Sequence, residues 1–322
     1  MARPSSRLDP GSVVLVTGAN GYIASTVVDI LLKQGFNVRG TVRSFKPWLQ
    51  KMFDEKYGYG RFETVVLPDL RLQEDLEVVL EGAQGLIHVA SALSCGTDAE
   101  EAIDETRAHT LAALQAAANV PTIRNSWNEK AVSASRSTET SIDDLPSKVY
   151  AASKTEGERA LWNFVRDHKP HFAVNTILPA ATFGTILCPE IGGSTMGVVR
   201  QLISGDAQAF DVMPGQWFVD VTDCGRLHVA ALLDKSIEQQ RIFATAEPFT
   251  WTDIVAILCK IRPQIEGIPD PPSNEGRDLS QIEARYKAEH ILRSYWGLRG
   301  WTTLEESIIA GINDLLSGDR IQ

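Results

Sequence analysis

A glycine-rich turn between an apolar strand and a helix is the feature that most constrains the fold of this chain. Residues 12–17 (SVVLVT) form a short continuous apolar run, which predicts a strand buried on both faces. From Tyr22 to Gln34 the apolar residues recur at helical spacing, and Gly35 ends the run. The sequence therefore predicts a strand, a tight turn and a helix as the first unit of the fold.

The same alternation of strand and helix continues through the first half of the chain. Strands are predicted at residues 37–42 (NVRGTV), 61–66 (RFETVV) and 85–90 (GLIHVA), and helical patterns occupy 72–80 and 98–118. Repeated alternation of this kind predicts an α/β fold built on a doubly wound parallel sheet, the Rossmann architecture.

The turn after the first strand, GANGYIA (18–24), has the residues that a dinucleotide pyrophosphate requires. Gly18 permits the tight turn, Gly21 lets the backbone approach a phosphate, and the small Ala24 lets the helix pack closely. The N-terminus of the helix then faces the anion. Because the turn follows a predicted strand and opens a predicted helix, we expect dinucleotide binding and not merely a structural turn.

The end of the second strand indicates which dinucleotide is bound. An NAD site places a carboxylate there to hold the ribose 2′-hydroxyl, whereas residues 37–53 contain no acid and include Arg39, Arg43 and Lys46. This pattern favours NADP(H). The alternative is that Arg43 and Lys46 are ordinary solvated charges at the end of a strand.

One tyrosine and one lysine stand four residues apart on a predicted helix. Tyr150 and Lys154 begin the stretch YAASKTEGERALWNFV, so both side chains project from one face. A tyrosine with a pKa of about 10 is a poor proton donor at pH 7, but a nearby ammonium favours the phenolate and lowers that pKa. Together with the dinucleotide turn, the pair predicts proton transfer to a carbonyl oxygen; the alternative is a surface pair on a helix.

The chain resembles the extended short-chain dehydrogenase/reductases, in the branch of dihydroflavonol reductases, cinnamoyl-CoA reductases and fungal aldehyde or ketone reductases. The matching segments run through nearly the whole sequence: VTGANGYIAS, VRGTVRS, Asp69-Leu70, HVAS (88–91), SWNEKAV (126–132), YAASKTEGERALW, LPAATFG (178–184), WFVDVTDCGRLHVAAL (217–232) and RIFATAEPFTWTDI (241–254). The resemblance implies an NADPH-dependent reductase of an aldehyde or ketone, with a place in secondary metabolism.

The resemblance also implies roles for individual residues. Tyr150 is then the proton donor, and Lys154 binds the nicotinamide ribose and lowers the pKa of the tyrosine. Asp69 and Leu70 lie near the adenine, Ala90 and Ser91 near the central ribose, and Pro179 near the nicotinamide. The implied cofactor-binding residues are Thr17, Gly18, Asn20, Gly21, Tyr22, Ile23, Arg43, Lys46, Asp69, Leu70, Ala90, Ser91, Tyr150, Lys154 and Pro179.

One strand that the resemblance implies is not recognisable in the sequence. In the family, a buried strand ending in Thr-Ser-Ser follows the helix that ends near residue 118, and one of its serines hydrogen-bonds the substrate carbonyl. Between Thr122 and Val149 this chain has no apolar run of four and no regular alternation. We therefore expect one central strand to be missing between Arg124 and Ser126. Ser126 is the candidate to replace the catalytic serine, with TIRNS (122–126) as a short replacement strand.

The missing serine leaves two alternative functions open. Loss of one preorganised hydrogen-bond donor to a developing oxyanion raises the activation free energy by about 2.7 to 4 kcal/mol, so the enzyme is expected to be slow. One alternative is a catalytically inactive NADP-binding protein. The other is an NAD(P)-dependent epimerase or dehydratase, which shares the turn and the Tyr/Lys pair.

The pattern becomes less regular beyond Gly184, which indicates a second part of the molecule. We expect an NADP-binding domain over residues 1–184, with 217–245 packing back on it, and a substrate-binding lobe over 185–322.

Composition excludes several other function classes. The formal net charge of −10, with no long basic run, is unfavourable for binding nucleic acid. The four cysteines have no metal-ligand spacing, so no metal is expected and a reducing compartment is the default. No apolar stretch approaches the length of a membrane span or of a signal-peptide core. We expect a soluble cytoplasmic monomer or homodimer that acts on a small-molecule carbonyl substrate.

Overall fold

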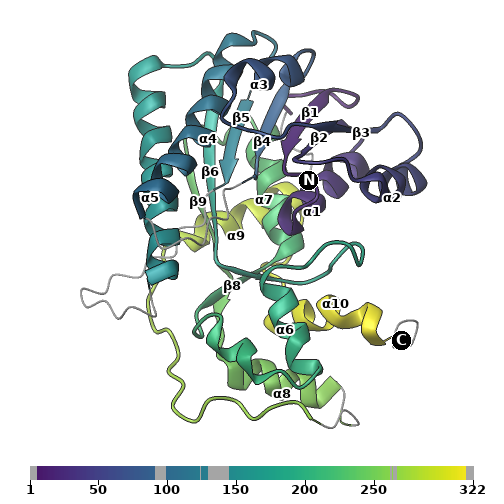
Figure 1. Ribbon diagram of the computed structural model, residues 1–322, viewed down its shortest axis with the longest axis vertical. Coiled ribbons are helices and arrows are strands. Elements are labelled where there is room, and N and C mark those ends of the chain that lie inside the picture. Colours follow the sequence, from purple (N-terminus) through teal and green to yellow (C-terminus); the bar gives the residue numbers. More distant parts are fainter. Residues whose placement is uncertain are drawn as a thin grey trace. The chain divides into compact units, whose positions relative to one another are not determined.

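The computed structural model describes residues 6–90, 99–123, 125–129, 145–261, 263 and 267–316, and of residues 99, 125–129, 145–148 and 316 it describes the backbone alone. The larger of two sheets has seven strands in the order β3-β2-β1-β4-β5-β6-β9 (Figure 1). The strands are β1 (Val13–Thr17), β2 (Asn37–Val42), β3 (Phe62–Val66), β4 (Gly85–His88), β5 (Asn125–Glu129), β6 (Ala173–Pro179) and β9 (Arg241–Ala244). From β3 to β6 every neighbouring pair is parallel, which confirms the doubly wound parallel sheet.

The predicted strands and helices of the first half appear within a few residues of their expected positions. The helices of this half are α1 (Tyr22–Lys33), α2 (Pro47–Tyr57), α3 (Gln73–Leu80), α4 (Ala99–Asn119) and α5 (Leu145–His168). Helix α5 begins five residues before Tyr150, so Tyr150 lies in its second turn and Lys154 in its third, and the pair does not stand at the start of the helix. Helix α7 (Val221–Leu233) lies later in the chain, and the boundary between the two compact units described below falls within it.

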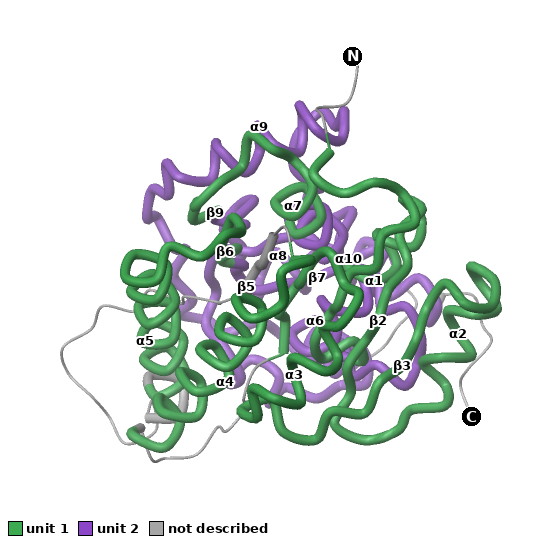
Figure 2. Tube along the Cα trace, turned by 90° about the horizontal axis from the view of Figure 1, so that it is seen from above, with its two compact units in different colours: residues 1–20, 27–178, 228–242 green, residues 21–26, 179–227, 243–322 purple. Residues whose placement is uncertain are grey.

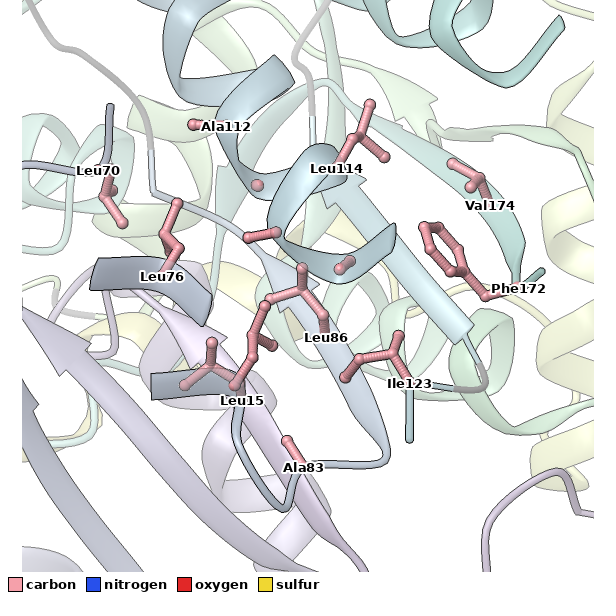
Figure 3. Close-up of a cluster of buried hydrophobic side chains, with 14 of the residues drawn as sticks. Leu15, Leu70, Leu76, Ala83, Leu86, Ala112, Leu114, Ile123, Phe172 and Val174 are labelled. Atoms are coloured by element: carbon pink, nitrogen blue, oxygen red, sulfur yellow. The ribbon is translucent and has the colours of Figure 1, made fainter. Parts of the chain in front are cut away.

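A cluster of buried apolar side chains joins the sheet to α3, α4 and α5, which lie along one face of it (Figures 2 and 3). The sheet contributes Leu15 from β1, Leu86 from β4 and Val174 from β6, all fully buried. Burial of each such side chain stabilises the fold by about 1.5 to 3 kcal/mol. The helices contribute Leu76, Val79 and Leu80, then Ala112, Ala113, Leu114, Ala116 and Ala117, then Leu161, Phe164 and Val165.

The expected absence of a central strand between Arg124 and Ser126 is not confirmed. Strand β5 lies between β4 and β6, with Ser126 opposite Leu86 on one side and Val174 on the other. The strand has the sequence NSWNE and begins three residues after the start of the expected replacement TIRNS. Its polar sequence has no strand pattern. A segment between two parallel strands can nevertheless form backbone hydrogen bonds to both neighbours, and these bonds do not depend on its side chains.

The chain divides into two compact units, coloured separately in Figure 2. The first unit comprises residues 1–20, 27–178 and 228–242, and the second comprises 21–26, 179–227 and 243–322. The second unit holds a three-stranded sheet of β7 (Ala181–Phe183), β8 (Trp217–Asp220) and β10 (Glu247–Pro248), in the order β10-β8-β7. Its other elements are α6 (Thr195–Ile203), the 3-10 helix η2 (Ala207–Asp211), α8 (Trp251–Ile261), α9 (Arg285–Trp296) and α10 (Leu304–Leu316).

Within the part of the chain that the structure describes, no helix combines the length and the apolar character that a membrane span requires.

Candidate active site

The strand order reverses between β1 and β4, and the predicted binding residues follow the carboxyl ends of the strands on both sides of this point. Thr17 ends β1, Arg43 follows β2, and Ala90 lies two residues after β4. Open parallel sheets bind ligands at the crevice beyond such a switch point. The topology alone therefore brings these three residues to one edge of the first unit.

Gly18 makes the tight turn after β1. Its backbone has a φ of +68°, in the left-handed region that favours glycine, and a Cβ there would lie 3.0 Å from the Cβ of Ala90. The N–H of Gly18 donates to Thr41 Oγ1 at 3.2 Å, and the N–H of Ala19 donates to the Thr41 carbonyl at 2.9 Å. The turn is thus held against β2, and a side chain at Gly18 would push it away from Ala90.

Gly40, in the middle of β2, is a site feature that the sequence analysis did not single out. A Cβ at this position would lie 2.7 Å from the Cβ of Ala19 and 2.7 Å from the ring of Phe62. Only glycine leaves the turn enough room to approach the strand. A lone glycine inside a strand pattern was the signal that could have identified it.

The basic side chains around β2 differ in whether other parts of the protein already bind them. Arg39 donates from Nε to Glu63 Oε2 at 2.9 Å and from Nη1 to the carbonyls of Val79 and Glu81 at 2.7 and 2.9 Å. Its guanidinium therefore holds β2 to β3 and to the end of α3, which corrects its inclusion among the residues that favour NADP.

Arg43, by contrast, is exposed just beyond the end of β2, and among the described residues it makes no hydrogen bond or ion pair. Lys46 is half-buried and immediately precedes α2. A guanidinium just beyond the end of β2 that has no partner among the described residues, with no acid on this stretch, suits a 2′-phosphate better than a 2′-hydroxyl.

The residues expected near the adenine follow β3. Asp69 accepts hydrogen bonds from the backbone N–H, Nε and Nη2 of Arg71, and these bonds lower the pKa of Asp69 to about 2. Leu70 is buried in the apolar cluster. His109 of α4 faces the charges of Asp69, Arg71, Arg43 and Glu105, and burial lowers its pKa. Its Nδ1 is buried with no hydrogen-bond partner among the described residues, and sequence reasoning missed it.

The predicted Tyr/Lys pair is brought together on α5. The Nζ of Lys154 lies 5.2 Å from the centre of the Tyr150 ring. Lys154 is only 4% exposed, whereas Tyr150 is half-buried. A buried ammonium beside a phenol favours the phenolate, and the role of the pair in proton transfer remains a prediction.

One predicted site residue is only partly described, and another is not described. Ser126 is the second residue of β5, three residues before its carboxyl end, and only its backbone is described. Its catalytic role remains a prediction. Ser91 lies outside the described residues.

In the second unit, two segments that carried the family resemblance meet around Asp220. This residue caps α7 by accepting the N–H groups of Thr222 and Asp223 at 2.8 and 3.3 Å, and it accepts the hydroxyl of Ser307 at 3.0 Å. Burial, reinforced by the charge of Asp223, raises the pKa of Asp220. A Cβ at Gly184 would lie 2.6 Å from Asp220 Oδ2, so LPAATFG and WFVDVTD fit together only with glycine there.

Tyr22 and Pro179, both predicted to bind cofactor, also belong to the second unit. The Tyr22 hydroxyl donates to the Gly184 carbonyl at 2.8 Å, and burial raises its pKa well above the usual value. Pro179 ends β6 and is buried. The Tyr22 side chain is therefore buried, and its hydroxyl proton is already used in the hydrogen bond to Gly184.

Comparison with known proteins places these features in a family. Residues 14–244 match the NAD dependent epimerase/dehydratase family. The chain is 41% identical over 330 residues to the ketoreductase adrE of Penicillium rubens, covering 94% of this chain and 96% of that protein. It is 38% identical to aldehyde reductase 2 of Sporidiobolus salmonicolor, covering 94% and 95% of the two chains.

Solved structures share the fold. Yeast methylglyoxal/isovaleraldehyde reductase Gre2, complexed with NADPH, superimposes with a TM-score of 0.77 at 21% identity, covering 95% of this chain and 98% of that one. Vestitone reductase from alfalfa gives a TM-score of 0.72 at 20% identity, covering 95% and 98%. The matched family, the relatives and the shared fold together show that the chain belongs to the NAD-dependent epimerase/dehydratase family of extended short-chain dehydrogenase/reductases.

Proposed function

We propose that this protein is an NADPH-dependent reductase that converts an aldehyde or a ketone to an alcohol. The observation that carries the proposal is the buried ammonium of Lys154 beside the Tyr150 ring, on a helix of the same unit that holds Gly18 at the start of the glycine-rich turn. The names of the relatives, ketoreductase and aldehyde reductase, support a carbonyl substrate.

The residues present fit NADP(H) as the cofactor. Gly18 and Gly40 leave space for the turn where side chains would fill it, and the Arg43 guanidinium, just beyond the end of β2, has no hydrogen-bond or ion-pair partner among the described residues. The NADPH complex of the Gre2 relative supports the same assignment. When bound, NADPH supplies the hydride.

In the proposed mechanism, Tyr150 protonates the alkoxide oxygen as negative charge develops there. The Lys154 ammonium stabilises the phenolate that Tyr150 becomes after it gives up its proton. The same ammonium would hold the nicotinamide ribose. Ser126 remains the proposed donor to the substrate carbonyl, and loss of such a donor typically lowers kcat by about 10² to 10³.

The domain roles follow from this function. We propose that residues 1–184 bind the cofactor, with 217–245 packing on that part, and that 185–322 form the substrate-binding lobe. A cytoplasmic location, a monomeric or homodimeric state and independence from nucleic acid complete the proposal.

The test is consumption of NADPH by the purified full chain with a panel of aliphatic and aromatic carbonyls. We expect turnover that is lost in Tyr150→Phe, with NADPH binding retained in that variant. Cofactor binding without turnover of any carbonyl by the wild-type chain would instead support an inactive NADP-binding protein. Binding of a nucleotide sugar with NAD(H) preferred over NADP(H) would support an epimerase or dehydratase.

A further inference from the structure

A buried carboxylate on α5 accepts four hydrogen bonds from three elements of the first unit. Glu158 is 5% exposed, and its Oε1 and Oε2 accept from Nε and Nη2 of Arg241 on β9 at 2.7 and 2.8 Å. Oε1 also accepts from the hydroxyl of Thr176 on β6 at 3.0 Å and from the indole N–H of Trp162 on α5 at 3.1 Å. The carboxylate thus connects α5 with β6 and with β9.

This network suits a charged carboxylate and holds it in one orientation. Burial by itself would raise the pKa of Glu158, but the hydrogen bonds from Arg241, Trp162 and Thr176 outweigh that effect and keep the pKa below its usual value. The two bonds from one planar guanidinium specify direction as well as distance. Rotation or sliding of α5 would therefore break several charge-assisted bonds at once.

The partners of Glu158 are themselves held firmly in the first unit. The N–H of Thr176 donates to the Gln240 carbonyl at 2.8 Å, next to Arg241 in sequence. The neighbouring Asn175 is fully buried and donates to the carbonyls of Ala231 and Ile237 at 3.1 and 3.0 Å. Strands β6 and β9 thus provide a rigid support, and they lie beside α5 in Figure 1.

Glu158 lies on the same helix as the Tyr/Lys pair, four residues after Lys154 and eight after Tyr150. Residues spaced by four lie on one face of a helix, so Tyr150, Lys154 and Glu158 follow one another along it. The strand β5 that runs beside β6 is short and polar, with the sequence NSWNE. The hydrogen bonds of Glu158 to β6 and β9 therefore hold in place the face of α5 that carries Tyr150 and Lys154.

We propose that Glu158 is a positioning residue of the active site, which acts through α5 to set the placement of Lys154 against Tyr150. This inference rests on the proposed function for its kinetic consequence. Its structural content, the placement of the ammonium beside the phenol, is independent of the substrate.

The test compares Glu158→Gln with Arg241→Gln. Each variant breaks the ion pair, and each should lower kcat by about 10-fold to 100-fold, because small displacements of a catalytic group lower the rate. NADPH affinity should fall by a smaller factor, because Lys154 is one of several residues proposed to hold the cofactor. Thr176→Val removes a single bond and should change kcat in the same direction by less. Asp29→Asn is the matched control, since Asp29 binds Lys56 and Tyr57 elsewhere in the first unit and should leave kcat unchanged.

A second readout needs no substrate. The ionisation of Tyr150 is followed by phenolate absorbance against pH, as the difference between each chain and its Tyr150→Phe counterpart. Displacement of Lys154 raises the tyrosine pKa in both Glu158→Gln and Arg241→Gln. A purely electrostatic influence would shift it in opposite directions, since the two variants remove opposite charges.

The proposal is overturned if both variants keep the wild-type kcat and Tyr150 ionisation while only their melting temperatures fall, or if their shifts are opposite. If the wild-type chain reduces no carbonyl, the proposed function fails, and the ionisation of Tyr150 still decides the role of Glu158.

Discussion

Thr17 donates its hydroxyl proton to Nδ1 of His88, and both side chains are buried. Thr17 Oγ1 accepts the N–H groups of Val89 and Ala90 at 3.1 Å each, which occupies its lone pairs and directs its proton to His88 Nδ1 at 3.0 Å. Nδ1 therefore accepts this hydrogen bond. One hydroxyl thus ties the end of β1 to the residues that follow β4.

The first prediction concerns this hydroxyl. Thr17→Val keeps the shape of the side chain but leaves the two N–H groups and His88 Nδ1 without their shared partner, which should lower the free energy of unfolding by about 1 to 3 kcal/mol. NADPH affinity should fall as well, because Ala90 stands against Gly18 in the phosphate turn. Denaturant unfolding and calorimetric titration measure the two effects. Thr17→Ser retains the hydroxyl and should behave like the wild type.

The second prediction concerns the phosphate turn. Gly18→Ala forces a left-handed backbone and a 3.0 Å contact with Ala90, so NADPH affinity should fall by at least tenfold. Gly11→Ala is the matched control, since Gly11 also has a positive φ, of +87°, but has open space around its Cβ position. Equal loss of cofactor affinity in the two variants, measured by calorimetry, would show that backbone strain and not close approach matters.

The third prediction concerns the choice of cofactor. Removal of the Arg43 guanidinium in Arg43→Ala should weaken NADPH binding by about 10-fold to 150-fold, the equivalent of 1.5 to 3 kcal/mol for a charge-assisted hydrogen bond. NADH binding should be unchanged because it has no 2′-phosphate. Lys51→Ala, on the exposed face of α2, controls for a general loss of positive charge. Equal weakening of both cofactors would contradict the assigned role of Arg43.

The fourth prediction concerns pH. Burial lowers the pKa of His109, so the folded chain holds it neutral where the unfolded chain, with an ordinary pKa of about 6.5, is already protonated. Protons then favour the unfolded state, and stability should fall as the pH drops below about 6.5 toward the lowered folded pKa. His109→Gln removes this dependence. Urea midpoints at pH 7.5 and at lower pH provide the measurement, with His290→Gln on α9 as control; an unchanged pH slope in His109→Gln would contradict the prediction.

The elements with a strong local pattern were predicted correctly from the sequence. The continuous apolar runs of β1 and β4, the helical spacing of α1 and the glycine at position 18 are each visible in a short window, because strand, helix and turn preferences depend on near neighbours. The i,i+4 spacing of Tyr150 and Lys154 predicted their proximity for the same reason.

The failures occurred where contacts between distant segments decide the structure. For β5 the sequence predicted only a short replacement strand at TIRNS (122–126), whereas the strand is Asn125–Glu129, because its two neighbours in the sheet supply its hydrogen bonds and its sequence carries no alternation. Arg39 and Arg43 look alike in the sequence, but only the folded chain brings Glu63 and two carbonyls of the α3 region to Arg39. Local periodicity thus determined most strands of the sheet, the tight turn at Gly18 and the proximity of Tyr150 and Lys154. Tertiary structure decided which arginine side chains are already bound by other parts of the protein. It also decided which carboxylate holds α5 to the sheet, because Glu158 and Arg241 stand 83 residues apart and meet only when the sheet is complete.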